Sequence, residues 1–233
     1  MTLPDLSPAP FSTIDTWVFD LDNTLYPRSC NLWAQIDRLI TLYVMEVTGL
    51  GHDDARVLQK GFYRDHGTTM NGLMDRYGID PEDYLARVHR IDYSPVGADP
   101  GLVAAIAALP GRKLIFTNAD AGHVGEVLGR LGGGDLFEAV HDIRASAFSP
   151  KPLRAAYDRL LATHGLDPAR TIMFDDLEKN LVVPHEVGMT TVHVVPTGAF
   201  ASDAVESWEL SRADEAAHVH HVTDDLAGWL RRV

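Results

Sequence analysis

The chain has 233 residues, of which 45% are hydrophobic, and it carries a formal net charge of −13 at pH 7. This length and composition suit one large domain, or a core domain with an insertion. The acidic balance argues against non-specific binding to nucleic acid or to anionic membrane surfaces.

Cysteine content and hydropathy restrict the cellular compartment. The single cysteine, Cys30, excludes an intrachain disulfide and a cysteine-based metal cage, and it fits a reducing compartment. No run approaches the ~18 consecutive apolar residues that a membrane helix needs, and the first residues lack the pattern of a secretory signal. We therefore expect a cytoplasmic protein.

The first part of the chain predicts one strand followed by a long helical block. Residues 1–13 include three prolines and look like a loose leader, and apolar residues then predict a strand from Thr16 to Leu21. From Asn31 to Tyr93 apolar residues recur at helical spacing, and no strand is predicted. Within this block, Asp80 and Pro81 are typical of a helix start.

From Pro95 onward, short apolar runs alternate with helical segments. The runs predict four further strands, namely Lys113 to Asn118, Phe137 to Ile143, Thr171 to Phe174 and Thr190 to Val195. Because each run is almost continuously apolar, we expect a parallel sheet with helices on both faces. The predicted fold is α/β, with a doubly wound, mostly parallel sheet as the core (residues 14–28 and 95–233) and an inserted all-helical cap (residues 29–94).

Three predicted strands end in polar pairs, which are Asp20/Asp22, Thr117/Asn118 and Asp175/Asp176. Each pair alone is ordinary turn chemistry, but the carboxyl ends of parallel strands line the ligand crevice of a doubly wound sheet. Alternation along an extended chain would aim Asp20 and Asp22 to the same side, and two such carboxylates resist ionising together unless a cation lies between them. With Lys151 opening a helix between the last two pairs, the set suits phosphoryl transfer assisted by Mg²⁺, which prefers oxygen ligands.

These segments resemble, in order and spacing, the four motifs of the haloacid dehalogenase-like (HAD) phosphohydrolases. The matching stretches are Phe19-Asp20-Leu21-Asp22-Asn23-Thr24-Leu25-Tyr26, then Thr117-Asn118, then Ser149-Pro150-Lys151-Pro152, and finally Phe174-Asp175-Asp176-Leu177-Glu178-Lys179-Asn180. The resemblance implies a Rossmann-like core, and the helical block resembles the HAD cap that lies between motifs one and two. Each motif alone is weak, whereas the ordered set is specific.

The resemblance also implies a role for each catalytic residue. Asp20 would be the nucleophile that forms an aspartyl-phosphate, and Asp22 would protonate the leaving oxygen and then deprotonate the attacking water. Thr117 would donate a hydrogen bond to a phosphate oxygen. Lys151 would pair with the phosphate and with Asp20.

Phosphate and metal contacts follow from the same resemblance. The implied phosphate-binding residues are Leu21, Asp22, Thr117, Asn118 and Lys151. The implied Mg²⁺ ligands are Asp20, the main-chain carbonyl of Asp22, Asp176 and, as an open alternative, Asp175. We favour Asp176 over Asp175, because Asp175 stands where many relatives have glycine, and we expect Asn180 to support Asp176.

Within the superfamily, the motifs resemble the pyrimidine 5′-nucleotidase group. The resemblance lies in Asp22-Asn23-Thr24-Leu25-Tyr26-Pro27, in the double acid, and in Gly188-Met189-Thr190-Thr191. It implies hydrolysis of a nucleoside monophosphate such as UMP or CMP. The alternatives are another small ester, such as a sugar phosphate or phosphoglycolate, an inactive phosphate-binding or scaffold relative, and a haloacid dehalogenase. Asp22 and the double acid argue against the dehalogenase.

The expected partner is a small phosphorylated substrate, with no nucleic acid and no membrane, and the chain is expected to be a monomer or homodimer. Some polar residues lie outside the four motifs. We interpret His123 as a helix-start residue. We expect His218, His220 and His221 to lie in an exposed tail. The candidates for contacts with the leaving group are Tyr26, Arg28, Asn31, Arg64 and His66.

Overall fold

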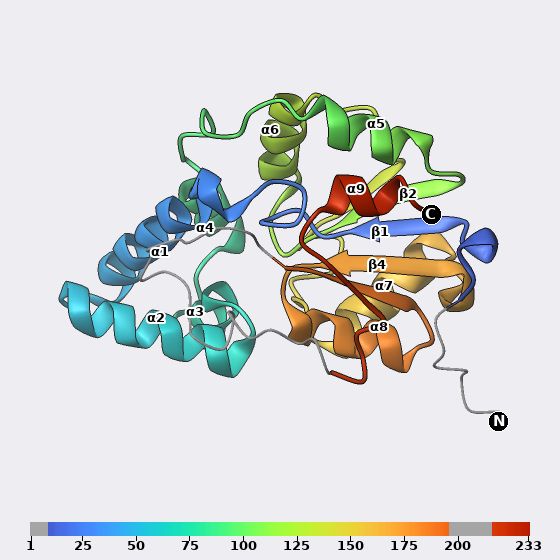
Figure 1. Ribbon diagram of the computed structural model, residues 1–233. Helices are drawn as coiled ribbons and strands as arrows, with labels where there is room; N and C mark the ends of the chain where they lie inside the picture. Colours follow the sequence, from blue (N-terminus) through green and yellow to red (C-terminus); the bar gives the residue numbers. More distant parts are fainter. Residues whose placement is uncertain (1–8, 196–215) are drawn as a thin grey trace. The chain divides into compact units, whose positions relative to one another are not determined.

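The computed structural model describes residues 9–195 and 216–233, and these residues form two compact units (Figure 1). Within the described residues, the first unit comprises 9–30, 96–195 and 216–233, and the second comprises 31–95. The predicted core also contains 196–215, which lie outside the described residues. None of the described helices combines the length and the apolar character that crossing a membrane requires.

The first unit contains a six-stranded sheet in which all neighbouring strands are parallel. In spatial order the strands are β3 (Ala139–His141), β2 (Arg112–Phe116), β1 (Thr16–Phe19), β4 (Thr171–Asp175), β5 (Thr190–Val194) and β6 (His221–Thr223). This arrangement confirms the predicted α/β doubly wound fold. The strand order reverses between β1 and β4, and open α/β sheets bind their ligands at such a point.

Helices follow most of these strands and cover the sheet. The helices of the first unit are α5 (Pro100–Ala108), α6 (Ala121–Leu131), α7 (Arg154–His164), α8 (Val182–Glu186) and α9 (Leu226–Leu230), with short 3-10 turns η1 (Phe11–Thr13), η2 (Arg28–Cys30), η3 (Pro168–Arg170) and η4 (Glu178–Leu181). Aspartates begin three of these α-helices, because the side chains of Asp99, Asp120 and Asp225 accept hydrogen bonds from main-chain N–H groups of the first turn.

The core lies on both faces of the sheet, because successive strand residues point to opposite sides. On one face, Val18 packs in a buried cluster with Tyr157 of α7. On the other face, the Phe19 and Phe174 rings stack with centroids 4.6 Å apart, and Phe174 meets Trp229 of α9 at 5.5 Å. Each such buried side chain contributes ~1.5–3 kcal/mol to folding, so β1 and β4 are fixed side by side at the centre of the sheet (Figure 1).

The second unit is entirely helical in its regular structure. Its helices are α1 (Leu32–Thr48), α2 (His52–His66), α3 (Thr69–Tyr77) and α4 (Pro81–Val88). A buried polar network joins α1 to α2, since Asp37 accepts hydrogen bonds from Gln59 at 2.7 Å, Arg56 at 2.8 Å and Lys60 at 3.0 Å. The buried acid is therefore compensated inside this unit.

Candidate active site

Parallel strands bring the predicted polar pairs to one edge of the sheet. Phe19 pairs with Phe174 in the ladder, and the next residue, Asp20, donates its N–H to the main-chain oxygen of Phe174 at 2.9 Å. Asp20 therefore lies beside Asp175, the last residue of β4. The hydroxyl of Thr24 donates to Oδ2 of Asp20 at 2.9 Å, a contact that was not predicted.

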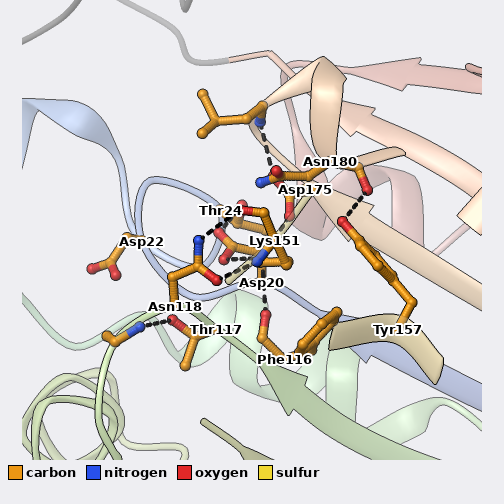
Figure 2. Close-up of polar contacts among 12 residues, drawn as sticks. Asp20, Asp22, Thr24, Phe116, Thr117, Asn118, Lys151, Tyr157, Asp175 and Asn180 are labelled. Atoms are coloured by element: carbon orange, nitrogen blue, oxygen red, sulfur yellow. Dashed lines mark hydrogen bonds and ion pairs between the residues drawn. The ribbon is translucent and has the colours of Figure 1, made fainter. Parts of the chain in front are cut away.

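Lys151 lies at the centre of this site with its side chain 1% exposed. Its ammonium donates to Oδ1 of Asp20 and Oδ2 of Asp175, both at 2.7 Å, and to the main-chain oxygen of Phe116 at 3.0 Å (Figure 2). These bonds use all three of its N–H donors. Burial lowers the pKa of Lys151, but the Asp175 and Asp20 carboxylates outweigh it and hold the pKa above its usual value. The ammonium is therefore a fixed positive charge next to Asp20.

The side-chain amide of Asn118 fixes the backbone of Lys151. Its Oδ1 accepts from the Lys151 N–H at 2.8 Å, and its Nδ2 donates to the Lys151 carbonyl at 3.1 Å (Figure 2). A phosphate contact from Asn118 would therefore use its main-chain N–H. The same holds for Leu21, because its hydrocarbon side chain has no hydrogen-bond donor.

Asp175 accepts hydrogen bonds from the protein on both of its carboxylate oxygens. Besides Lys151 on Oδ2, its Oδ1 accepts from the Leu177 N–H and from Nδ2 of Asn180, each at 2.9 Å. Tyr157 in turn donates its hydroxyl to the Asn180 carbonyl at 2.8 Å. The expectation that Asn180 supports Asp176 is therefore wrong, because the amide bonds to Asp175 instead.

Asp176 is paired with an arginine from the loop after β1. Nη2 of Arg28 donates to its Oδ2 at 2.8 Å, with both side chains buried. His193 of β5 donates Nε2–H to the Asp176 carbonyl at 3.1 Å. We expected Arg28 to contact the leaving group, but its guanidinium is bound to this carboxylate.

One oxygen from each of Asp20, Asp175 and Asp176 lies within 4.8 Å of the others, and all three residues are buried. Burial is the main cause that raises the pKa of Asp20, and Lys151 only partly opposes it. Burial and neighbouring Asp175 likewise raise the pKa of Asp176, against the opposing charge of Arg28. Three buried carboxylates thus face two buried cations, so an added cation would compensate the remaining charge. The all-oxygen donor set fits a hard divalent ion.

Asp22 lies apart from these three acids. The strand ends at Phe19, and Asp22 is in a turn in which the Leu25 N–H donates to the Leu21 carbonyl at 3.0 Å. The strand alternation that was expected to aim Asp20 and Asp22 together therefore does not extend to Asp22, and Figure 2 shows the Asp22 carboxylate to one side of the Lys151 contacts.

Two donors that were not predicted bind the Asp22 carboxylate. His123 donates Nε2–H to Oδ1 at 2.7 Å, and the Tyr26 hydroxyl donates to the same oxygen. Burial lowers the pKa of His123, but the Asp22 and Asp120 carboxylates outweigh it, so the pKa is raised. The interpretation of His123 as merely a helix-start residue is therefore incomplete. Tyr26, a candidate for leaving-group contact, is buried against Asp22.

Thr117 keeps a hydrogen-bond donor available at the same edge of the sheet. Its buried Oγ1 accepts from the Ala119 N–H at 3.0 Å (Figure 2), and among the described residues its hydroxyl hydrogen has no acceptor. A hydroxyl donates one hydrogen while accepting through its lone pairs. Thr117 is therefore equipped to donate to an anionic ligand.

The remaining expectations have mixed outcomes. The three histidines near the C-terminus do not form an exposed tail, because His221 belongs to β6, Nδ1 of His220 accepts from the Thr191 N–H at 3.0 Å, and His218 pairs with Glu178. The last candidates for leaving-group contact lie in the helical unit, and they are Asn31, Arg64 and His66.

The first unit has a Rossmann-like architecture, with a buried group of acids and a lysine at the carboxyl ends of its parallel strands. The family model of the haloacid dehalogenase-like hydrolases matches residues 14–181. The chain belongs to this family.

A curated relative and many solved structures are similar to the chain. Phosphate metabolism protein 8 of Saccharomyces cerevisiae is 26% identical over 222 residues, which cover 87% of this chain and 67% of that protein. The structure of CbbY from Rhodobacter sphaeroides in complex with phosphate is 15% identical with a TM-score of 0.62, over 92% of this chain and 95% of that one.

An L-2-haloacid dehalogenase from Xanthobacter autotrophicus with chloropropionic acid covalently bound is also 15% identical, with a TM-score of 0.56, over 94% of this chain and 97% of that one. At such identities the two structures support the fold alone.

Proposed function

We propose that this chain is a Mg²⁺-dependent phosphomonoester hydrolase that forms an aspartyl-phosphate on Asp20. The observation that carries the proposal is the buried contact between Asp20 and Lys151 within a group of three carboxylates. A carboxylate approaches a phosphate dianion only when positive charge reduces their repulsion. Lys151 supplies a fixed part of that charge. The buried carboxylates outnumber the buried cations, so a divalent cation would supply the rest.

Two displacement steps follow from the placement of the acids. In the first, an oxygen of Asp20 attacks phosphorus, the bond from phosphorus to the ester oxygen breaks, and Asp22 gives its proton to that oxygen. In the second, Asp22 takes a proton from water, the water oxygen attacks phosphorus, and the bond between phosphorus and the Asp20 oxygen breaks, which releases inorganic phosphate and regenerates the Asp20 carboxylate. Thr117 donates its free hydroxyl hydrogen to a phosphate oxygen, and the main-chain N–H groups of Leu21 and Asn118 donate to others.

The metal would be held by Asp20, Asp176 and the main-chain carbonyl of Asp22. When bound, it supplies positive charge to the phosphoryl group and orients it for displacement. Asp175 has a different role in this proposal, because its carboxylate accepts three hydrogen bonds from the protein, whereas that of Asp20 accepts two. It holds Lys151 against Asp20.

The substrate class that we propose is a nucleoside monophosphate, such as UMP or CMP. Support comes from the likeness of the turn after β1 and of the double acid to the pyrimidine 5′-nucleotidase group. The similarity to a yeast protein named for phosphate metabolism and the phosphate bound in CbbY are consistent with phosphate chemistry. Another small ester, such as a sugar phosphate or phosphoglycolate, is the alternative within the same reaction.

The dehalogenase reaction suits this site less well. A haloacid carries one carboxylate, and halide departure requires no proton donor, so neither Asp22 nor the Asp175–Asp176 pair would be needed. Three buried acids would also disfavour an anionic substrate without an added cation. An inactive scaffold is disfavoured because the nucleophile, lysine, hydroxyl and second acid are all present.

The test is hydrolysis of p-nitrophenyl phosphate with Mg²⁺ and with excess EDTA, beside chloride release from 2-chloropropionate. We expect phosphate release that requires Mg²⁺ and no chloride release. A panel of UMP, CMP, sugar phosphates and phosphoglycolate, compared by kcat/KM, then ranks the substrates. Chloride release without metal would replace the proposal with a dehalogenase, and absence of both activities would favour the scaffold.

A further inference from the structure

Two side chains from different elements contact one oxygen of Asp22. The His123 ring reaches it from α6 with Nε2 at 2.7 Å from Oδ1, although 101 residues separate the two in sequence. The Tyr26 hydroxyl donates to the same Oδ1 from the turn that carries Asp22 itself. The imidazole is 0% exposed, whereas the Asp22 side chain remains 21% exposed. The buried donors therefore lie behind a carboxylate that solvent can still reach.

The backbone fixes both donors in place. The main-chain N–H of His123 donates to Oδ1 of Asp120 at 2.8 Å, which ties its residue to the first turn of α6. The turn after β1 is closed by the Leu25 N–H on the Leu21 carbonyl at 3.0 Å, and the Tyr26 ring is buried. Neither side chain needs to reorganise to hold Asp22.

The stability of the fold does not require the hydrogen bond from His123 to Asp22. An imidazole loses hydration when it is buried, and its hydrogen bond returns only part of that cost. A leucine at position 123 would fill a buried helical site without any polar group. A role in holding the Asp22 carboxylate in one orientation would explain why the imidazole is buried despite this loss of hydration. Misplacement of a reacting group by ~1 Å lowers rates on the order of 10²-fold.

We propose that His123, together with Tyr26, is a positioning residue that orients the Asp22 carboxylate for proton transfer to and from the ester and water oxygens. This inference rests on the proposed phosphatase function. His123 acts through Asp22 and touches neither substrate nor metal. Its contribution should be largest where proton donation matters most, which is with leaving groups of high pKa.

The experiment compares His123→Leu, His123→Gln and Tyr26→Phe with the unmodified full-length chain. Glutamine keeps an N–H donor near the position of Nε2, leucine removes it, and phenylalanine removes only the hydroxyl. Each variant is assayed with Mg²⁺ on aryl phosphates of increasing phenol pKa and on one alkyl phosphate, glycerol 2-phosphate. The value of kcat/KM reports formation of the phosphoenzyme, and circular dichroism with thermal unfolding checks the fold. His164→Gln, in a histidine outside the site, is the control.

We expect His123→Leu to lose on the order of 10²-fold in kcat/KM on glycerol 2-phosphate and far less on p-nitrophenyl phosphate, whose leaving group needs little protonation. His123→Gln should recover most of the loss, and Tyr26→Phe should show the same dependence on leaving group more weakly.

An equal loss across the whole ester series, or no recovery by glutamine, would overturn the positioning role. If His123→Leu does not fold, Tyr26→Phe and His123→Gln decide the same question. An unmodified chain that hydrolyses none of the esters would instead overturn the proposed function itself, so the two failures are distinguishable.

Discussion

Arg28 and Asp176 form a buried ion pair with 2.8 Å between Nη2 and Oδ2, and their side chains are only 6% and 5% exposed. The arginine comes from the loop after β1, and the aspartate follows β4. The pair joins two segments 148 residues apart in sequence. It also places a positive charge beside a carboxylate that we propose as a metal ligand, so folding and metal binding should be coupled there.

Removing Arg28 should therefore destabilise the protein. Arg28→Met leaves Asp176 buried without its cation, and breaking a buried pair costs about 3–5 kcal/mol. Urea unfolding in EDTA measures the change, and added Mg²⁺ should recover part of it by binding only the folded state. The control is Arg64→Met, whose ion pair with Asp65 is exposed, and it should change stability little. Equal effects of the two substitutions would contradict the structural role of Arg28.

The two acids of the fourth motif should respond differently to neutralisation. Asp176→Asn should raise the Mg²⁺ concentration needed for half-maximal activity, because it removes a proposed metal ligand. Asp175→Asn should instead lower kcat at saturating Mg²⁺, because the Lys151 ammonium loses an anionic partner at 2.7 Å. Activity titrated with Mg²⁺ in each variant separates the effects. The opposite pattern would make Asp175 the metal ligand.

His141 should make the fold sensitive to acid. Burial and neighbouring His164 lower the pKa of His141 from 6.5 to about 4. Between pH 6.5 and about 4, His141 is therefore protonated in the unfolded chain and neutral in the folded chain. Stability from this group is complete above pH 6.5 and is lost as pH falls toward 4, with a slope of up to ~1.4 kcal/mol per pH unit.

The variant His141→Gln isolates that contribution. The unfolding free energy of the unmodified protein minus that of the variant, measured by urea between pH 4 and 7, should decrease as the pH falls, because glutamine has no charge to gain. A constant difference between the two curves would mean that the imidazole does not titrate on unfolding.

The sheet was predictable because its central strands are uniformly apolar. Trp17 to Phe19 and Ile172 to Phe174 are buried on both faces, so their sequence shows the continuous pattern of parallel strands. The strand β6 was not predicted, because His221 to Thr223 is short, and its neighbours are polar. Its place in the sheet follows from pairing with β5, which no local pattern indicates.

The acids at the strand ends were also found from sequence, since their positions follow from the ends of apolar runs, and Lys151 was found from its resemblance to the third motif. Their partners were not. Whether Asn180 reaches Asp175 or Asp176 depends on one residue of turn geometry, and the contact of His123 with Asp22 joins distant segments. A histidine at the start of a helix after the second motif was the available signal, but helix-start residues of this kind are common.

The whole mechanism depends on Asp20 as a nucleophile that works beside a bound cation. The decisive measurement is mass spectrometry of acid-quenched enzyme after mixing with its best phosphate ester, in Mg²⁺ and in EDTA, for the unmodified chain and for Asp20→Asn. We expect one phosphoryl group on the peptide that contains Asp20, only with Mg²⁺ and only in the unmodified chain. Turnover by Asp20→Asn at the unmodified rate, or phosphorylation of a different residue, would contradict the mechanism.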